Sequence, residues 1–162
     1  MTEDHPERLR RGVWLAPGVF VLHFLEESPT FVAWFNAHVT NGITQDLFWT
    51  VNLVGLAITI VLAFVVWTAQ STVSLALVIA WLSFLMLANA IVHIVGAVVD
   101  GAYVPGLATA VALYVPYCVW IGVHVVRSRL MSAGPVVLAA LLGGLPMAIH
   151  GYRILFLGSR LF

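Results

Sequence analysis

The sequence contains little charge, no lysine and a single cysteine. Charged residues make up 9% of the 162 residues, the formal net charge is zero, and all seven basic residues are arginines. Without a basic surface the chain has nothing to bind a phosphate backbone, so we expect no nucleic-acid partner. Without lysine it has no side-chain amine for Schiff-base chemistry. The lone Cys118 excludes an intramolecular disulfide and a two-cysteine metal site.

Apolar residues are abundant instead. They make up 62% of the chain, and the mean hydropathy is +1.03, which is typical of a protein whose solvent is the lipid bilayer. The apolar segments are 12–25, 47–67, 75–99, 107–126 and 135–157. We predict an all-α, polytopic membrane helix bundle with about five transmembrane helices. Glu-Glu-Ser-Pro follows the first segment where a signal peptide carries small residues, which favours a span there.

Two connecting segments have their own character. Trp34 and Phe35 stand beside polar residues, which favours a short helix at the membrane interface. Residues 100–106 contain two glycines and a proline, which predicts a turn. We expect two regions, an N-terminal cytoplasmic segment over 1–11 and one membrane-embedded helical domain over 12–162.

The arginines predict the orientation. With five crossings they form two groups, Arg8, Arg10, Arg11, Arg127 and Arg129 on one side and Arg153 and Arg160 on the other. The positive-inside rule then predicts an integral protein of the cell membrane with a cytoplasmic N-terminus and an external C-terminus.

The pentad from His23 to Glu27 places an imidazole and two carboxylates at the end of the first apolar segment. His23, Glu26 and Glu27 stand at i, i+3 and i+4, so one face of a helix carries all three side chains. Ionisable groups are costly in a bilayer, so in such a place they usually have a function.

Two more histidines are expected at a similar depth. A helical rise of about 1.5 Å per residue puts His23 and Glu27 roughly 16 to 23 Å above the cytoplasmic start of the first span. The same rise puts His93 roughly 27 Å and His150 roughly 22 Å above that side. Because polar groups avoid lipid, we expect them to converge inside the bundle. Asn89 lies one turn from His93 on the same face, as a ligand or a hydrogen-bond partner.

Three motifs make the sequence similar to a known family. They are His23-x-x-Glu26-Glu27, Asn89-x-x-x-His93 and Tyr103-x-Pro105-Gly106. On these motifs the chain resembles the HXXEE family of small integral membrane proteins. The resemblance supports these residues, and an enzymatic role for them, but it names no reaction.

A metal site is the first hypothesis for this group. Histidine nitrogens and carboxylate oxygens are ligands of zinc, manganese and iron, and helix bundles hold such ions between facing helices. The candidate ligands are His23, Glu26, Glu27, His93 and His150; Glu26 and Glu27 are also the candidate catalytic residues, and Asn89, Tyr103 and Arg153 the supporting ones. The pentad lacks the second histidine of the metalloprotease helices, so protease chemistry is not implied. We expect an enzyme that acts on a lipophilic small molecule.

Two other functions remain open. Adjacent carboxylates in an apolar site cannot both ionise easily, so one of them can hold a proton for a metal-free isomerase or terpene-type cyclase. Intramembrane His and Glu residues also form proton relays and transport sites, although the inner half of the bilayer here has few of them. A structural role is a further alternative, in which Arg153 pairs with Glu26 or Glu27.

Overall fold

Helices joined by short turns make up the part of the chain that the structure, a computed structural model, describes: 5–39, 42–69 and 71–157. These residues contain no strand, which confirms the predicted all-α class. In chain order the elements are α1 (His5–Val13), α2 (Leu15–Glu27), α3 (Phe31–His38), α4 (Gln45–Ala69), α5 (Thr72–Leu82), η1 (Ser83–Ala88), α6 (Asn89–Asp100), α7 (Leu107–Thr109), η2 (Ala110–Tyr114), α8 (Val115–Arg127), α9 (Ala133–Tyr152) and η3 (Arg153–Leu157), where η marks a π-helical turn.

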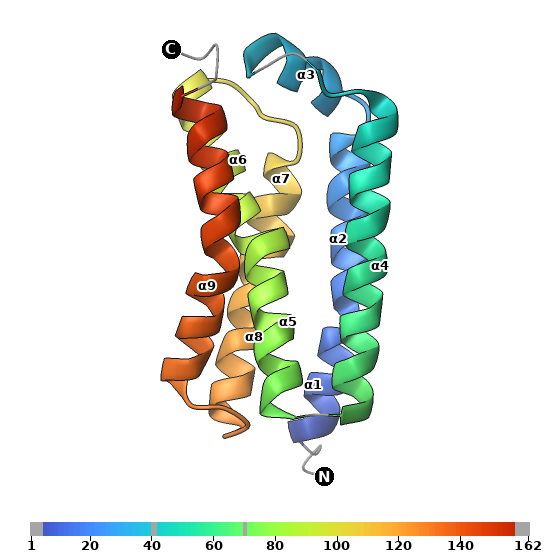
Figure 1. Cartoon of the computed structure of the whole chain (residues 1–162), viewed down its shortest axis with the longest axis vertical. Coiled ribbons are helices and arrows are strands. Elements are labelled where there is room, and N and C mark those ends of the chain that lie inside the picture. The colour runs from blue at the N-terminus through green and yellow to red at the C-terminus, as the bar shows by residue number, and fades with distance from the viewer. Residues whose placement is uncertain (1–4, 40–41, 70, 158–162) are drawn as a thin grey trace.

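About five helical rods run along the bundle, as predicted. Four of them are long and apolar enough to cross a membrane, namely Gln45–Ala69, Thr72–Asp100, Leu107–Arg127 and Ala133–Leu157. The fifth consists of α1 and α2, which join at Trp14 and together run beside α4 along the length of the bundle (Figure 1). The protein is therefore a membrane protein by the length and composition of its helices.

The described chain begins at one end of the bundle with α1 and finishes at the other end with η3 (Figure 1). Which end faces the cytoplasm stays a prediction. Helix α1 begins before residue 12 and buries Leu9 and Val13, so part of the predicted N-terminal segment belongs to the first rod. Residues 1–4 of that segment, and Arg160 of the arginine pattern, lie outside the described residues.

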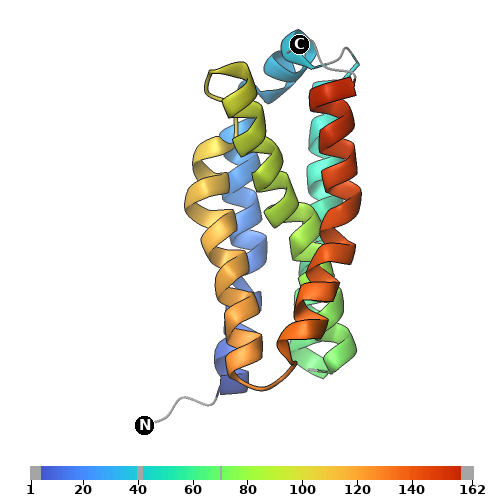
Figure 2. The ribbon, with the colours of Figure 1, turned by 90° about the vertical axis from the view of Figure 1, so that its left-hand side faces the viewer.

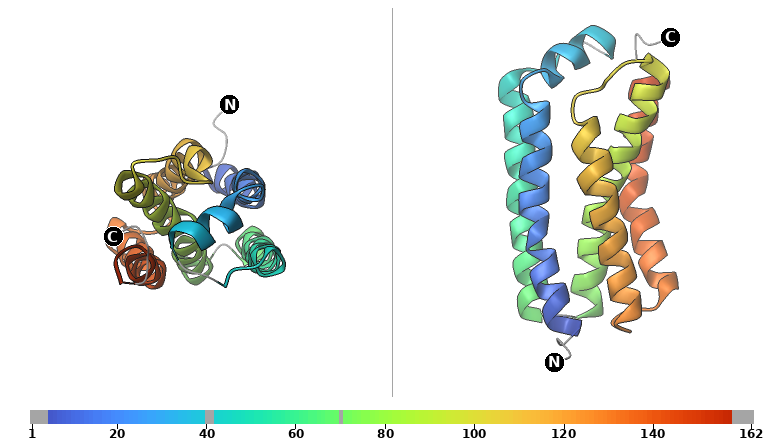
Figure 3. Two further views of the ribbon diagram at one scale, coloured as in Figure 1. Left: turned by 90° about the horizontal axis from the view of Figure 1, so that it is seen from above. Right: turned by 180° about the vertical axis from the view of Figure 1, so that it is seen from behind.

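Helix α3 lies across the end of the bundle rather than along it (Figures 1 and 3). Its indole Trp34 Nε1 donates to Asp100 Oδ2 at 3.4 Å, and the Trp34 ring stacks on His38 with centroids 5.4 Å apart. His38 Nε2 lies 3.8 Å from the same carboxylate oxygen. These contacts fasten α3 to the last residue of α6, so the short helix predicted at the interface forms a roof over the bundle.

Two π-helical turns, η2 and η1, come before Pro116 and Asn89 respectively. Pro116 has no N–H to donate to the carbonyl four residues earlier, which gives the local reason for the wider turn η2 just before it. The turn η1 comes directly before Asn89. Such turns rotate the following residues relative to a regular helix and are frequent at functional sites.

The bundle packs unevenly along its length. In one half, α5 and α9 approach so closely that a side chain in place of Gly143 would collide with the backbone of Ala80. In the other half, toward α3, a cavity of about 300 Å³ lies between the helices. The predicted histidine and glutamate layer falls in this second half.

Candidate functional site

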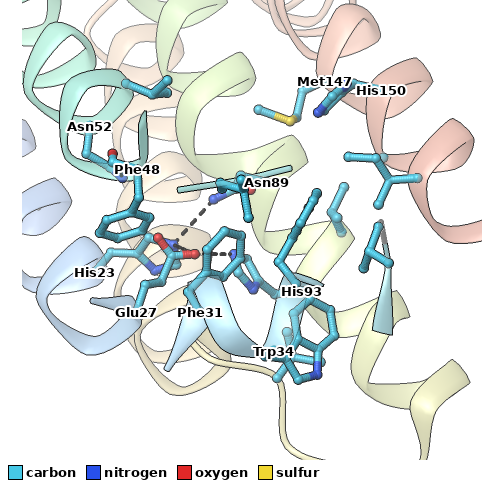
Figure 4. A pocket seen from close by; sticks show the side chains of 18 of the residues that line it. His23, Glu27, Phe31, Trp34, Phe48, Asn52, Asn89, His93, Met147 and His150 are labelled. Atoms are coloured by element: carbon cyan, nitrogen blue, oxygen red, sulfur yellow. Dashed lines mark hydrogen bonds and ion pairs between the residues drawn. The ribbon is translucent and has the colours of Figure 1, made fainter. Parts of the chain in front are cut away.

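The structure brings His23, Glu27 and His93 together at the inner wall of the cavity (Figure 4). Glu27 Oε1 lies 3.1 Å from His93 Nε2 and 3.5 Å from His23 Nε2. One ligand atom from each residue falls within 4.8 Å of the others, and all three side chains are buried. The two imidazole rings meet edge to face with centroids 5.1 Å apart. Two helices that are far apart in the sequence, α2 and α6, thus supply one compact cluster.

A hydrogen-bond chain assigns the protonated nitrogen of His23. Its Nδ1 lies 2.9 Å from Thr109 Oγ1. The Thr109 hydroxyl donates its one proton to Glu26 Oε2, 2.5 Å away, so it accepts from His23 Nδ1–H. This leaves a lone pair on His23 Nε2, the nitrogen that faces Glu27, and the Asn89 Nδ2 amide lies 3.3 Å from it. The nitrogen directed at the cluster is therefore the one suited to bind a cation.

Glu26 faces away from this cluster, toward the start of the fourth span. Its Oε1 accepts hydrogen bonds from the Tyr103 hydroxyl and the Ala108 amide, and its Oε2 from the Thr109 amide and hydroxyl. Carboxylates at a helix N-terminus satisfy free amides and interact favourably with the helix dipole. Partial burial and the Glu26 carboxylate raise the pKa of Tyr103, which keeps the phenol a donor. The carboxylate of Glu26 is thus fully engaged outside the cluster.

The backbone of Gly106 packs directly against the cluster. Its φ is +91°, a conformation that glycine adopts without strain. A Cβ at this position would stand 2.9 Å from Glu27 Cγ, 2.9 Å from His23 Cε1 and 3.0 Å from His93 Cε1. Glycine therefore lets the 101–106 turn approach all three members of the cluster.

Aromatic and apolar side chains surround the polar group. Tyr114 is fully buried, and its ring lies 4.1 Å from that of His23, centroid to centroid, in a tilted stack. The ring of Phe31, on the roof helix α3, lies 6.4 Å from that of His93. With these rings on both sides, the imidazoles have little freedom to rotate.

The other predicted site residues lie apart from the cluster. His150, on α9, lines the cavity but is exposed, and it stands away from His23, Glu27 and His93 (Figure 4). Arg153 is exposed on η3, and the ion pairs between described residues do not join it to Glu26 or Glu27. The predicted layer therefore divides into three parts. His23, Glu27 and His93 form the inner cluster beside Asn89, Glu26 contacts Tyr103 behind it, and His150 lies across the cavity.

Sequence reasoning missed Thr109 and Tyr114, and it took Gly106 as part of a turn and of a family motif but not as a neighbour of the cluster. Gly106 ends the Tyr103-x-Pro105-Gly106 motif and Thr109 follows it by three residues, so that motif was the available signal. For Tyr114, an aromatic residue in an apolar span, the sequence holds no such signal.

Fold and site together define a polytopic helical membrane protein with a buried His/Glu cluster. The family model described as "Protein of unknown function with HXXEE motif" matches residues 14–121, more than half of the chain. The protein belongs to the HXXEE family, as its three motifs predicted. Comparison with curated proteins and with solved structures finds no match. The matched segment includes every residue of the cluster and its hydrogen-bond chain, and it ends before His150.

Proposed function

We propose that this protein is a membrane-embedded enzyme in which His23, Glu27 and His93 bind one divalent metal ion and act on a lipophilic small molecule. The observation that carries the proposal is the convergence of two imidazoles and one carboxylate, with ligand atoms within 4.8 Å of one another, beside an apolar cavity. Two histidines and one carboxylate form the ligand set of many catalytic zinc sites and of non-haem iron sites. Three protein ligands leave positions open for water or substrate.

The surroundings of the cluster support a cation. His23 directs the lone pair of Nε2, not a proton, toward Glu27, so a cation between them would find a ligand atom on each side, and the Asn89 amide donates to this nitrogen otherwise. The buried carboxylate of Glu27 is costly in a bilayer without a positive partner. Metal-bound histidines commonly donate their other N–H to an oxygen, and His23 donates to Thr109 and through it reaches Glu26.

The roles of the residues follow from these contacts. A bound metal supplies Lewis-acid activation of a substrate oxygen or of water. His23, Glu27 and His93 hold it, while Thr109 and Glu26 fix the ring of His23 from behind and act as positioning residues. The aromatic rings of Tyr114 and Phe31 shield the cluster from water, which strengthens its electrostatic interactions.

A metal-free acid–base enzyme is the second candidate, and one distance favours it. His93 Nε2 and Glu27 Oε1 lie 3.1 Å apart, within reach for proton transfer. In this alternative Glu27 and His93 exchange a proton with the substrate. That one of the two adjacent carboxylates holds a proton stays a prediction, and in the structure Glu26 and Glu27 have different partners.

Metal content separates the two candidates. The full chain is purified in lipid nanodiscs after growth with zinc, manganese or iron, and bound metal is measured by mass spectrometry. We expect one ion per chain in the wild type, and loss of that ion in Glu27→Gln and His93→Ala. His124→Ala, a histidine on α8 that stacks on Trp120 away from the cavity, is the matched control and should keep the metal. Wild-type protein that binds none of the three ions would refute the metal site and leave the acid–base alternative.

A further inference from the structure

The cavity has no helical wall on one side. In the half of the bundle away from α3, α5 lies between α4 and α9 (Figure 1). Toward α3 the same rod continues as α6. In the rotated view α6 leans to the left, away from α9 (Figure 2). The cavity is lined there by Leu47 and Val51 of α4 and by His150 of α9, all of which are exposed. These residues mark an opening between α4 and α9.

This opening faces lipid rather than water. Both of its sides belong to helices long and apolar enough to span a membrane. The end of the bundle, where water would enter, is covered by Phe31, Trp34 and Phe35 of the roof helix α3, which also line the cavity. Helix α3 is held in place through Asp100. A molecule dissolved in the bilayer can therefore reach the cluster sideways, whereas the aqueous side is closed by aromatic rings.

Polar groups stand at the opening as well as at the inner wall. His150 is an exposed ionisable residue in an otherwise apolar helix, a costly arrangement that usually marks a substrate path. Asn52, on the α4 side (Figure 4), donates its amide N–H to the Phe48 carbonyl at 2.9 Å, which leaves its side-chain oxygen as an acceptor. Between the opening and the cluster the walls are apolar, with Leu85, Val92 and Met147 among them. A polar head group can therefore pass through the opening to the cluster. An apolar chain attached to it can fill the space between the cluster and the opening.

We propose that the substrate is a single-chain amphipathic lipid that enters from the bilayer between α4 and α9. Its oxygen-bearing head reaches His23, Glu27 and His93, and its chain leads back through the opening into the membrane. The cavity volume of about 300 Å³ lies at the small end of the range for small-molecule sites, which favours one chain over the two of a membrane phospholipid. This inference rests on the proposed function, because the head group is placed at the proposed metal site.

Photolabelling in nanodiscs tests the route. The probe is a long-chain fatty alcohol that carries a diazirine in its chain, and mass spectrometry locates the adducts on the full-length protein. We expect adducts at the cavity walls behind the opening, such as Leu85 and Val92, reduced by excess unlabelled long-chain alcohol. Adducts spread evenly over the lipid-facing residues of all helices, without competition, would overturn the proposal.

Bulky substitutions at the opening sharpen the test. Val51→Trp at the opening and Met147→Trp behind it narrow the path to the cluster and should lower labelling of Leu85 and Val92 about tenfold. Val54→Trp and Leu145→Trp are the matched controls, since both lie on the same helices with 54% exposure and do not line the cavity. Equal labelling in all four variants would refute the entrance.

Metal content in the same samples distinguishes this inference from the proposed function. Entrance variants that keep their metal and lose labelling support the route. Wild-type protein that is labelled in the cavity but holds no metal supports the route and refutes the metal. Metal-bound protein that is never labelled in the cavity refutes the route and leaves the metal site standing.

Discussion

The two sides of α2 differ sharply, although Glu26 and Glu27 are neighbours in the sequence. On one side Glu27 is 5% exposed and faces two imidazoles at the cavity wall. On the other side Glu26 is half-buried and accepts four hydrogen bonds from the 103–109 segment. Glu26 thus has a full set of hydrogen-bond donors, whereas Glu27 faces two imidazoles that can share a cation with it.

This difference shows how one helical motif serves two purposes. Successive residues on a helix point about 100° apart, so adjacent carboxylates reach different neighbours. Glu26 is stabilised at the N-terminus of a helix, which orders the turn that carries Gly106. Thr109 then connects the two sides, since it contacts both Glu26 and His23. The Glu26 side therefore supports the geometry of the Glu27 side without belonging to it.

Removing the charge of Glu27 should have the largest effect. In Glu27→Gln the proposed metal loses its only anionic ligand, and we expect its affinity to fall by more than about 100-fold, beyond the range typical for outer-shell residues. Isothermal titration with zinc in nanodiscs measures the affinity. Glu7→Gln, a surface glutamate paired with Arg11, is the control and should leave it unchanged. Equal affinity in both variants would contradict the role of Glu27 as a ligand.

A methyl group at Gly106 should disturb the cluster on the Glu27 side and the turn that approaches it. In Gly106→Ala the new Cβ meets Glu27 and both histidines and also strains a backbone with φ of +91°. We expect a loss of about 1–3 kcal/mol of stability from the strain and contact, together with weaker metal binding. Gly101→Ala shares the positive φ, +64°, but has no atom within 4 Å of its Cβ. Thermal unfolding and metal titration of both variants isolate the contact, and identical results would show that the cluster tolerates the methyl group.

Breaking the connection between the two sides should have a smaller effect. Glu26→Gln and Thr109→Val leave the ligands in place but release the ring of His23, and we expect each to weaken metal binding by about 10–100-fold. The double variant should be little worse than either single one, because both remove the same chain of hydrogen bonds. Titration of the three proteins measures this coupling. Fully additive losses would mean that Glu26 and Thr109 act independently on the site.

Removing His150 should affect the metal least. Because this residue is exposed across the cavity, His150→Ala should keep one metal per chain with an affinity within about twofold of the wild type, as expected for a residue without a shared contact. Metal titration and lipid photolabelling are compared on the same sample. If the variant loses metal as Glu27→Gln does, then α9 closes onto the cluster and His150 is a ligand, as the depth argument predicted.

The helices could be predicted because their cause is local. Long apolar segments between charged or helix-breaking residues leave a chain in lipid no alternative to hydrogen-bonded helices. The predicted segments 47–67, 75–99, 107–126 and 135–157 accordingly fall within the four long helices. The depth of His23, Glu27 and His93 follows from the rise per residue, and these three do meet.

The partners of these residues could not be predicted in the same way. The rotation of each helix about its axis depends on how its neighbours pack, and the apolar faces of the spans are too uniform to indicate it. The structure alone decided that Glu27, not Glu26, faces the imidazoles, and that His150 lines the cavity apart from them. It also decided that Thr109 and Gly106 contact the cluster, because that contact depends on a turn between two spans.

The amino-acid sequence by itself determined the solvent of this protein, its helices, its family and the layer that holds its ionisable groups, because apolar length and residue spacing act locally along the chain. Only the tertiary structure decided which of those groups form one cluster, which support it from behind, and which line the cavity apart from it. Those outcomes depend on the packing of helices distant in sequence. Turning α2 about its axis by the angle between successive residues, about 100°, would bring Glu26 to the place of Glu27.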